Sequence, residues 1–120
     1  MTMYKGETQP VIEKIPNVAL TYNVITFVAA VGPSPIPTEP VQGPDFEVPP
    51  GHAVVIKART TQGGNPTFWI GDSAAAVKTS PNLAIQKNDY EPYVKLWIAN
   101  TNILWLASNV VGAILELYIE

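Results

Sequence analysis

The triplet Gly71-Asp72-Ser73 follows an apolar run and could supply the nucleophile of a serine esterase. Such an esterase pairs its serine with a histidine that comes later in the chain, on an α/β scaffold. The only histidine, His52, precedes Ser73, and the surrounding sequence favours strands. A tight turn explains the same residues, because glycine tolerates unusual φ angles and Asp and Ser bond to the nearby backbone. We therefore predict that Ser73 lies in a turn and that the chain is not an enzyme.

The other reactive residue types do not predict a metal or cofactor site. A cupin-like metal site needs several histidines and a glutamate, so the single His52 is expected in a turn at the start of a strand. Asn88, Asp89 and Glu91 lack the ligand spacing of a dedicated calcium loop, and we expect a solvated turn there. The absence of cysteine excludes thiolate chemistry and disulfides. No glycine-rich turn precedes a helix to bind phosphate, so no cofactor is predicted.

The composition points to one domain that self-associates. A chain of 120 residues has room for a single core, and 47% hydrophobic residues exclude a disordered protein. Only 14% of the residues are charged, which leaves few ionised groups to keep a lone monomer in solution. The seven basic residues form no stripe, so nucleic acid is not an expected partner. No apolar run reaches the roughly 18–20 residues that span a bilayer, and no secretion signal is evident, so no membrane partner is predicted.

Proline divides the chain into an arm, a domain and a long loop. Residues 1–16 are predicted to form an extended N-terminal arm with a short strand at Val11–Ile15, and residues 17–120 a β-sandwich domain. Within that domain, residues 32–51 hold seven of the twelve prolines. Proline donates no backbone hydrogen bond, so this Pro-rich loop cannot lie inside a sheet over its whole length. It either links two strands, with a short strand near Asp45–Val48, or contacts a neighbouring subunit.

Short runs of β-branched and aromatic residues between turn residues predict about eight strands. The pattern indicates an all-β fold, a single antiparallel β-sandwich of jelly-roll-like type. Two hairpins are expected, one joining Ala53–Thr60 to Thr67–Gly71 and one joining Tyr93–Ile98 to Ile103–Ala107. A long strand is predicted at Leu20–Val31, a short one at Asn82–Gln86, and a further strand at Ala113–Glu120.

Alternation along three strands separates a core face from a second, more aromatic face. The core faces carry only aliphatic residues: Val54, Ile56 and Ala58; Val94, Leu96 and Ile98; Leu115, Leu117 and Ile119. The second faces would expose a contiguous apolar area, which usually marks an interface. The predicted interface residues, with one from the arm, are Tyr4, Val55, Tyr93, Trp97, Ile114 and Tyr118. The alternative is that the Pro-rich loop or a further strand layer of the same chain covers this face.

Two stretches resemble a known class of proteins. Phe46–Ala75, "FEVPPGHAVVIKARTTQGGNPTFWIGDSAA", and the C-terminal "LWIANTNILWLASNVVGAILELYIE" resemble small virion proteins of tailed bacteriophages. The resemblance implies a capsid decoration (cement) protein or a related head or tail accessory protein, commonly trimeric. It implies the major capsid protein as partner and the capsid surface as location, after assembly in the host cytoplasm. No catalytic residues come with this family.

The leading functional hypothesis is therefore a non-enzymatic virion structural protein that stabilises the capsid as a homo-oligomer, with a trimer expected. The alternative is a receptor- or glycan-binding tip module of a tail fibre. Trp69, Trp97 and Trp105 favour that alternative, because sugars stack on flat aromatic rings.

Overall fold

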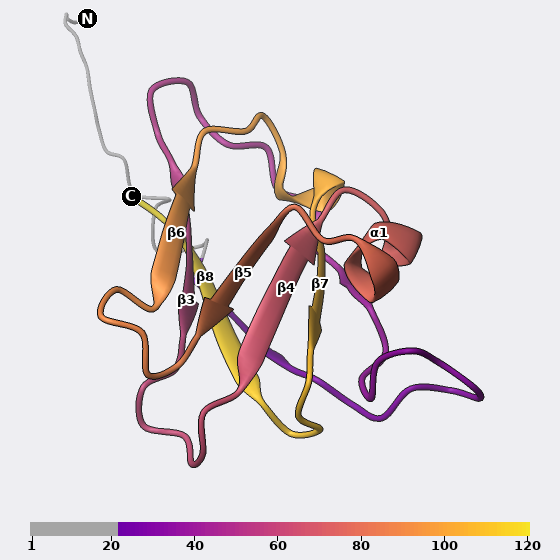
Figure 1. Ribbon diagram of the computed structural model, residues 1–120. Helices are drawn as coiled ribbons and strands as arrows, with labels where there is room; N and C mark the ends of the chain where they lie inside the picture. The colour runs from indigo at the N-terminus through magenta and orange to yellow at the C-terminus, as the bar shows by residue number, and fades with distance from the viewer. Residues whose placement is uncertain (1–21) are drawn as a thin grey trace, which may run out of the picture.

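The computed structural model describes residues 22–120, and these form an all-β sandwich with one short helix (Figure 1). The predicted arm, the strand at Val11–Ile15 and the interface residue Tyr4 lie outside the described residues. The strands are β1 (Asn23–Thr26), β2 (Val41–Gln42), β3 (Val54–Ala58), β4 (Thr67–Gly71), β5 (Leu83–Gln86), β6 (Tyr93–Leu96), β7 (Trp105–Ser108) and β8 (Ile114–Ile119). The helical elements are α1 (Ala74–Thr79) and a 3-10 turn, η2 (Thr101–Ile103).

The strands form two four-stranded antiparallel sheets with a jelly-roll arrangement. The first sheet has the order β1-β8-β3-β6 and the second the order β2-β7-β4-β5. Neighbouring pairs are therefore β1 with β8, β2 with β7, β3 with β6, and β4 with β5. The chain behaves as one long hairpin, bent between β4 and β5 and rolled into two layers. The predicted antiparallel sandwich of jelly-roll type is confirmed.

Both predicted hairpins are wrong, because each pair of strands is divided between the two sheets. β3 belongs to the first sheet and β4 to the second, and the same holds for β6 and β7. The Gln62 side chain ends β3 by exchanging two hydrogen bonds of 2.8 Å with the backbone of Ile114. The Asn100 side chain accepts from the Phe46 and Asn102 amides and so caps η2 between β6 and β7. These polar turns resemble hairpin turns in sequence, but their side chains direct the chain across the sandwich.

The core lies between the sheets and contains the aliphatic faces predicted from alternation. The β3 residues Val54, Ile56 and Ala58 are fully buried, and Leu115, Leu117 and Ile119 of β8 join them. The β6 residues that face inward are partly buried against the same cluster. Phe27 and Phe68 meet across the layers, with ring centroids 5.8 Å apart. The prediction of the core faces is confirmed for all three strands.

The expected strand Leu20–Val31 is regular only over Asn23–Thr26 in the described part of the chain. Beyond Phe27 the backbone pairs with the Pro-rich loop, through the Ala29–Thr38 bridge and the bond from the Ala30 amide to the Pro37 carbonyl. The loop contributes only the two-residue edge strand β2, as its prolines require. The expected strand at Asp45–Val48 is reduced to an isolated bridge from Glu47 to Asn100.

The outer face of the second sheet, called the covered face here, is packed under two segments of the same chain. Ile36 of the Pro-rich loop and Val77 of α1 are buried with Ala107 of β7, and Trp69 and Trp105 pack against them. Thr38 fixes the loop, since its hydroxyl donates to the Ser108 carbonyl at 2.7 Å and accepts from the Ser108 amide at 2.9 Å. Figure 1 shows α1 beside β4 and β7. No helix within residues 22–120 is long and apolar enough to cross a membrane.

Candidate interaction surface

Ser73 and His52, the residues considered for catalysis, both have structural contacts. Ser73 is the N-cap of α1, and its hydroxyl accepts a hydrogen bond from the Ala76 amide at 3.0 Å. Sequence reasoning predicted this local backbone bond but missed the helix that follows. His52 precedes β3 in the first sheet, where its Nδ1 lies 3.1 Å from the Glu120 carbonyl oxygen. Ser73 instead follows β4 in the second sheet.

The acidic segment 88–91 forms an exposed turn, as predicted. The Asp89 carboxylate accepts from the Gln86 amide at 2.8 Å, and the Asn88 amide donates to the Asn65 side chain at 2.9 Å. Across residues 22–120, no cluster of three or more histidine, aspartate or glutamate side chains is arranged to hold a metal ion.

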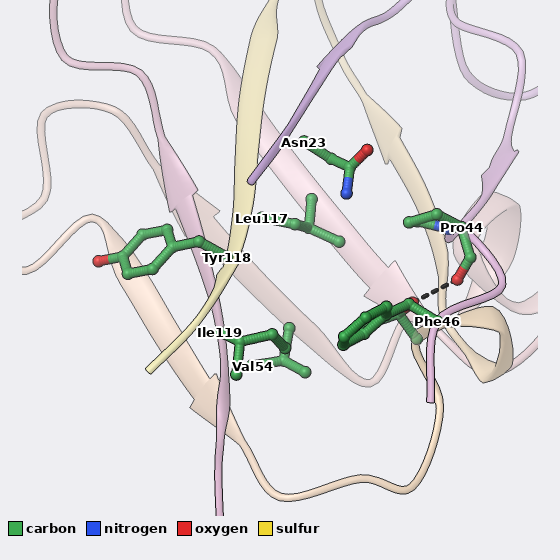
Figure 2. A pocket seen from close by; sticks show the side chains of 8 residues that line it. Asn23, Pro44, Phe46, Val54, Leu117, Tyr118 and Ile119 are labelled. Atoms are coloured by element: carbon green, nitrogen blue, oxygen red, sulfur yellow. Dashed lines mark hydrogen bonds between the residues drawn. The ribbon is translucent and has the colours of Figure 1, made fainter. Parts of the chain in front are cut away.

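A void between the first sheet and the Pro-rich loop is too small for an organic ligand. It measures about 10 Å³ and lies among Pro44, Phe46, Leu117 and other residues, which Figure 2 shows. A space of this size holds about one water molecule at most. The hydrogen bond from the Thr101 hydroxyl to the Pro44 carbonyl closes it on one side. The same view shows the Tyr118 side chain pointing away from Leu117 and Ile119, toward the outside of the first sheet.

That outer side of the first sheet, called the open face here, carries most of the predicted interface residues. Tyr93 and Trp97 are 41% and 68% exposed, whereas Ile114 and Tyr118 are half-buried. Val55 is only 3% exposed, which corrects the expectation that it adds exposed apolar area. Its cross-strand neighbours Lys95 and Tyr118 are larger and stand on either side of it.

Because Val55 is short and its neighbours are long, the open face is hollowed along β3. The hollow has a volume of about 320 Å³, near the lower end of the roughly 300–1,000 Å³ that is typical of ligand pockets. Its lining residues are Val55, Lys57, Tyr93, Lys95, Tyr118 and Glu120. Sequence alternation predicted Val55, Tyr93 and Tyr118 as interface residues, which remains a prediction. It missed the hollow, because β8, β3 and β6 become neighbours only through long-range pairing.

Two ion pairs organise the charges on the open face. The Arg59 Nε atom lies 2.6 Å from a Glu116 carboxylate oxygen, and its guanidinium also donates to the Tyr22 hydroxyl at 3.2 Å. The hydrogen bond with Glu116 is the main cause that raises the pKa of Arg59. Lys95 lies 2.8 Å from Glu120, and this hydrogen bond raises the pKa of Lys95.

Lys57 also lines the hollow, and it takes part in neither of these two ion pairs. The residues opposite Lys57 on the neighbouring strands are Tyr93 and Glu116, and Glu116 is already paired with Arg59. Within residues 22–120, no carboxylate lies within salt-bridge distance of Lys57. The two lysines of the lining outnumber its one glutamate, so the hollow presents a surplus positive charge between two tyrosines.

Comparisons of the chain with family models, with curated proteins and with solved structures each found no match.

Proposed function

We propose that this chain is a non-enzymatic structural protein of a bacteriophage virion, which self-associates through its open face and decorates the capsid. The observation that carries the proposal is the contrast between the outer faces of the two sheets. The chain covers one with its own helix and loop, whereas the other keeps Tyr93 and Trp97 in contact with solvent. Aromatic residues beside a few ionic groups are typical of interface centres.

The resemblance of Phe46–Ala75 and of the C-terminal stretch to small virion proteins supplies the biological setting. A decoration protein acts mechanically, by joining neighbouring capsid subunits, and repeated symmetric binding strengthens weak single contacts. A trimer fits this role, and the Pro-rich loop and the N-terminal arm are the segments that we expect to reach the major capsid protein.

Sedimentation velocity at micromolar concentration tests the self-association. The wild-type protein should sediment as an oligomer, with a trimer as the expected species. Trp97→Asp should weaken association by about 30-fold or more, because it places a carboxylate in the interface, and the β-rich circular dichroism should be unchanged. Val111→Asp is the matched control, since Val111 is also exposed but lies in the turn before β8. A monomeric wild-type protein would contradict the proposal.

Binding to phage heads tests the decoration role separately. The purified protein should bind expanded heads and raise their resistance to heat or to a chelator. An oligomer that leaves the heads unbound and their resistance unchanged would contradict decoration while leaving self-association in place.

The second candidate is a glycan-binding tip module, which the tyrosine-lined hollow and the exposed Trp97 favour. It predicts millimolar to micromolar binding to host polysaccharide, which Trp97→Ala should abolish. Under this alternative, the loss of glycan binding occurs without any change in the sedimentation of the protein.

A further inference from the structure

Tyr90 is the most exposed large hydrophobic residue in the described part of the chain, with 99% of its surface accessible. Single exposed apolar residues are common on protein surfaces and need no special account. Tyr90 differs because acidic residues flank it in the sequence. It stands between Asp89 and Glu91, at the tip of the turn that joins β5 to β6.

The turn that carries Tyr90 is held by several hydrogen bonds. The Asp89 amide donates to the Gln86 carbonyl at 3.1 Å while its carboxylate accepts from the Gln86 amide. The Lys87 ammonium donates to the Gln62 carbonyl at 2.9 Å, and the Asn88 amide bonds to Asn65. A turn fixed in this way loses little conformational entropy when its tip is bound, so the tyrosine is presented as a ready-made projection.

The hollow on the open face is complementary to this projection in shape and in charge. Tyr118 stands beside the floor made by Val55, and Tyr93 stands beside Lys57 in the same lining, so an aromatic ring that enters the hollow meets two tyrosines. Lys57 supplies the surplus positive charge of the hollow, since Lys95 is paired with Glu120, and Asp89 and Glu91 supply negative charge on both sides of Tyr90. Electrostatic complementarity of this kind selects a partner and fixes its orientation.

We propose that Tyr90 of one copy enters the hollow of a second copy, with its acidic neighbours facing Lys57. The contact is made between chains, because the almost complete exposure of Tyr90 shows that its own hollow does not hold it. This inference rests on the proposed self-association through the open face and names the contact that carries it. Repeated head to tail, the contact gives the expected trimer when three rotations close a ring, and made reciprocally it joins two copies.

The surface area that one tyrosine can bury is too small for a stable interface, so other residues of the open face must contribute. One buried tyrosine removes roughly 150–250 Å² from water. A specific interface buries about 1,200–2,000 Å² in total, so the remaining area must come from residues around the hollow, such as Trp97. Tyr90 is then the anchor of the interface, and Trp97 belongs to its surroundings.

Substitution of Tyr90 tests the anchor directly. Tyr90→Ala should weaken self-association by about 30-fold or more in sedimentation equilibrium, whereas Tyr90→Phe should change it by less than about 5-fold, because the ring remains. Thermal unfolding monitored at low protein concentration should be the same for all three proteins, since the side chain makes no intrachain packing contact. Val111→Ala is the control for loss of an exposed apolar side chain elsewhere.

A charge exchange tests the orientation. Lys57→Glu alone and Glu91→Lys alone should each weaken association, and an equimolar mixture of the two variants should form mixed assemblies more readily than either variant associates alone. Failure of the mixture to recover any association would overturn the proposed orientation.

The two proposals fail in distinguishable ways. If Tyr90→Ala associates like the wild type while Trp97→Asp does not, the open face is the interface but Tyr90 is not its anchor, and this inference is wrong. If the wild-type protein is a monomer, the proposed self-association and the inference fail together.

Discussion

The covered and open faces are both outer faces of antiparallel sheets, but segments of the same chain pack on the first, whereas the second keeps aromatic residues exposed. On the covered face, large residues stand beside small ones: Trp69 is paired with Ala107, and Trp105 with Gly71. The small residues leave room for other segments, and a Cβ atom on Gly71 would lie 2.8 Å from the Val77 side chain of α1. On the open face, the short Val55 stands between the longer Lys95 and Tyr118, and the hollow lies over Val55.

This difference shows that aromatic residues on the outer face of a sheet can be accommodated in two ways. Tryptophans that are paired with Ala or Gly accept a covering segment of their own chain. Tyrosines and a tryptophan that are mixed with ion pairs keep their polar groups hydrated, and such a surface can stay in contact with water. The contrast is the basis of the following predictions.

Removal of the loop contact on the covered face should have the largest effect on stability. Ile36→Ala should lower the free energy of unfolding by about 2–3 kcal/mol, because Ile36 is buried between α1 and β7 and its loss leaves a gap. Urea unfolding in the Trp97→Asp background, in which we expect association to be weakened, measures this effect.

Val31→Ala, just before this loop, is the matched control, since Val31 is 84% exposed. It should change stability by less than about 0.5 kcal/mol. Equal effects of the two substitutions would mean that the Pro-rich loop does not cover this face in solution.

The assignment of residues to faces could be predicted from the sequence because side chains alternate in any strand. Val54, Val94 and Leu115 were placed in the core on this basis alone, and they lie there or against it. Alternation says nothing about which strands pair. The segments after Arg59 and after Ile98 have the polar residues of hairpin turns, yet Gln62 and Asn100 bind distant backbone groups and direct the chain to the opposite sheet.

Helix α1 and the hollow escaped sequence analysis for different reasons. Ser73 followed by three alanines is a good helix start, but six residues are too few to show helical periodicity. The hollow requires the strand order β8-β3-β6, which brings together residues far apart in the sequence. Tyr90 did carry a signal that could have been used, because an aromatic residue stands there in an otherwise polar turn.

Loss of the α1 cap should have a smaller effect than loss of Ile36. Ser73→Ala removes the acceptor for the Ala76 amide and should lower the free energy of unfolding by about 1 kcal/mol. Ser73→Asp keeps an acceptor at the same place and should be close to the wild type, which separates the cap from other consequences of the substitution. Urea unfolding checks both variants, and a Ser73→Ala protein as stable as the wild type would show that the cap is not needed to hold α1 on the covered face.

The smallest effect is expected on the open face, from the pair of Lys95 and Glu120. The hydrogen bond with Glu120 raises the pKa of Lys95 in the folded protein above its ordinary value of 10.5. Its stabilisation is therefore fully present below about pH 10.5 and is lost as the pH rises through the higher, folded-state pKa. Both side chains are solvent-exposed, so the effect should be small and weaker still at high salt. Lys95→Gln should consequently lower the melting temperature slightly at pH 8 and less at pH 11, measured in the Trp97→Asp background, and an unchanged difference between the two pH values would show that the ion pair does not stabilise the open face.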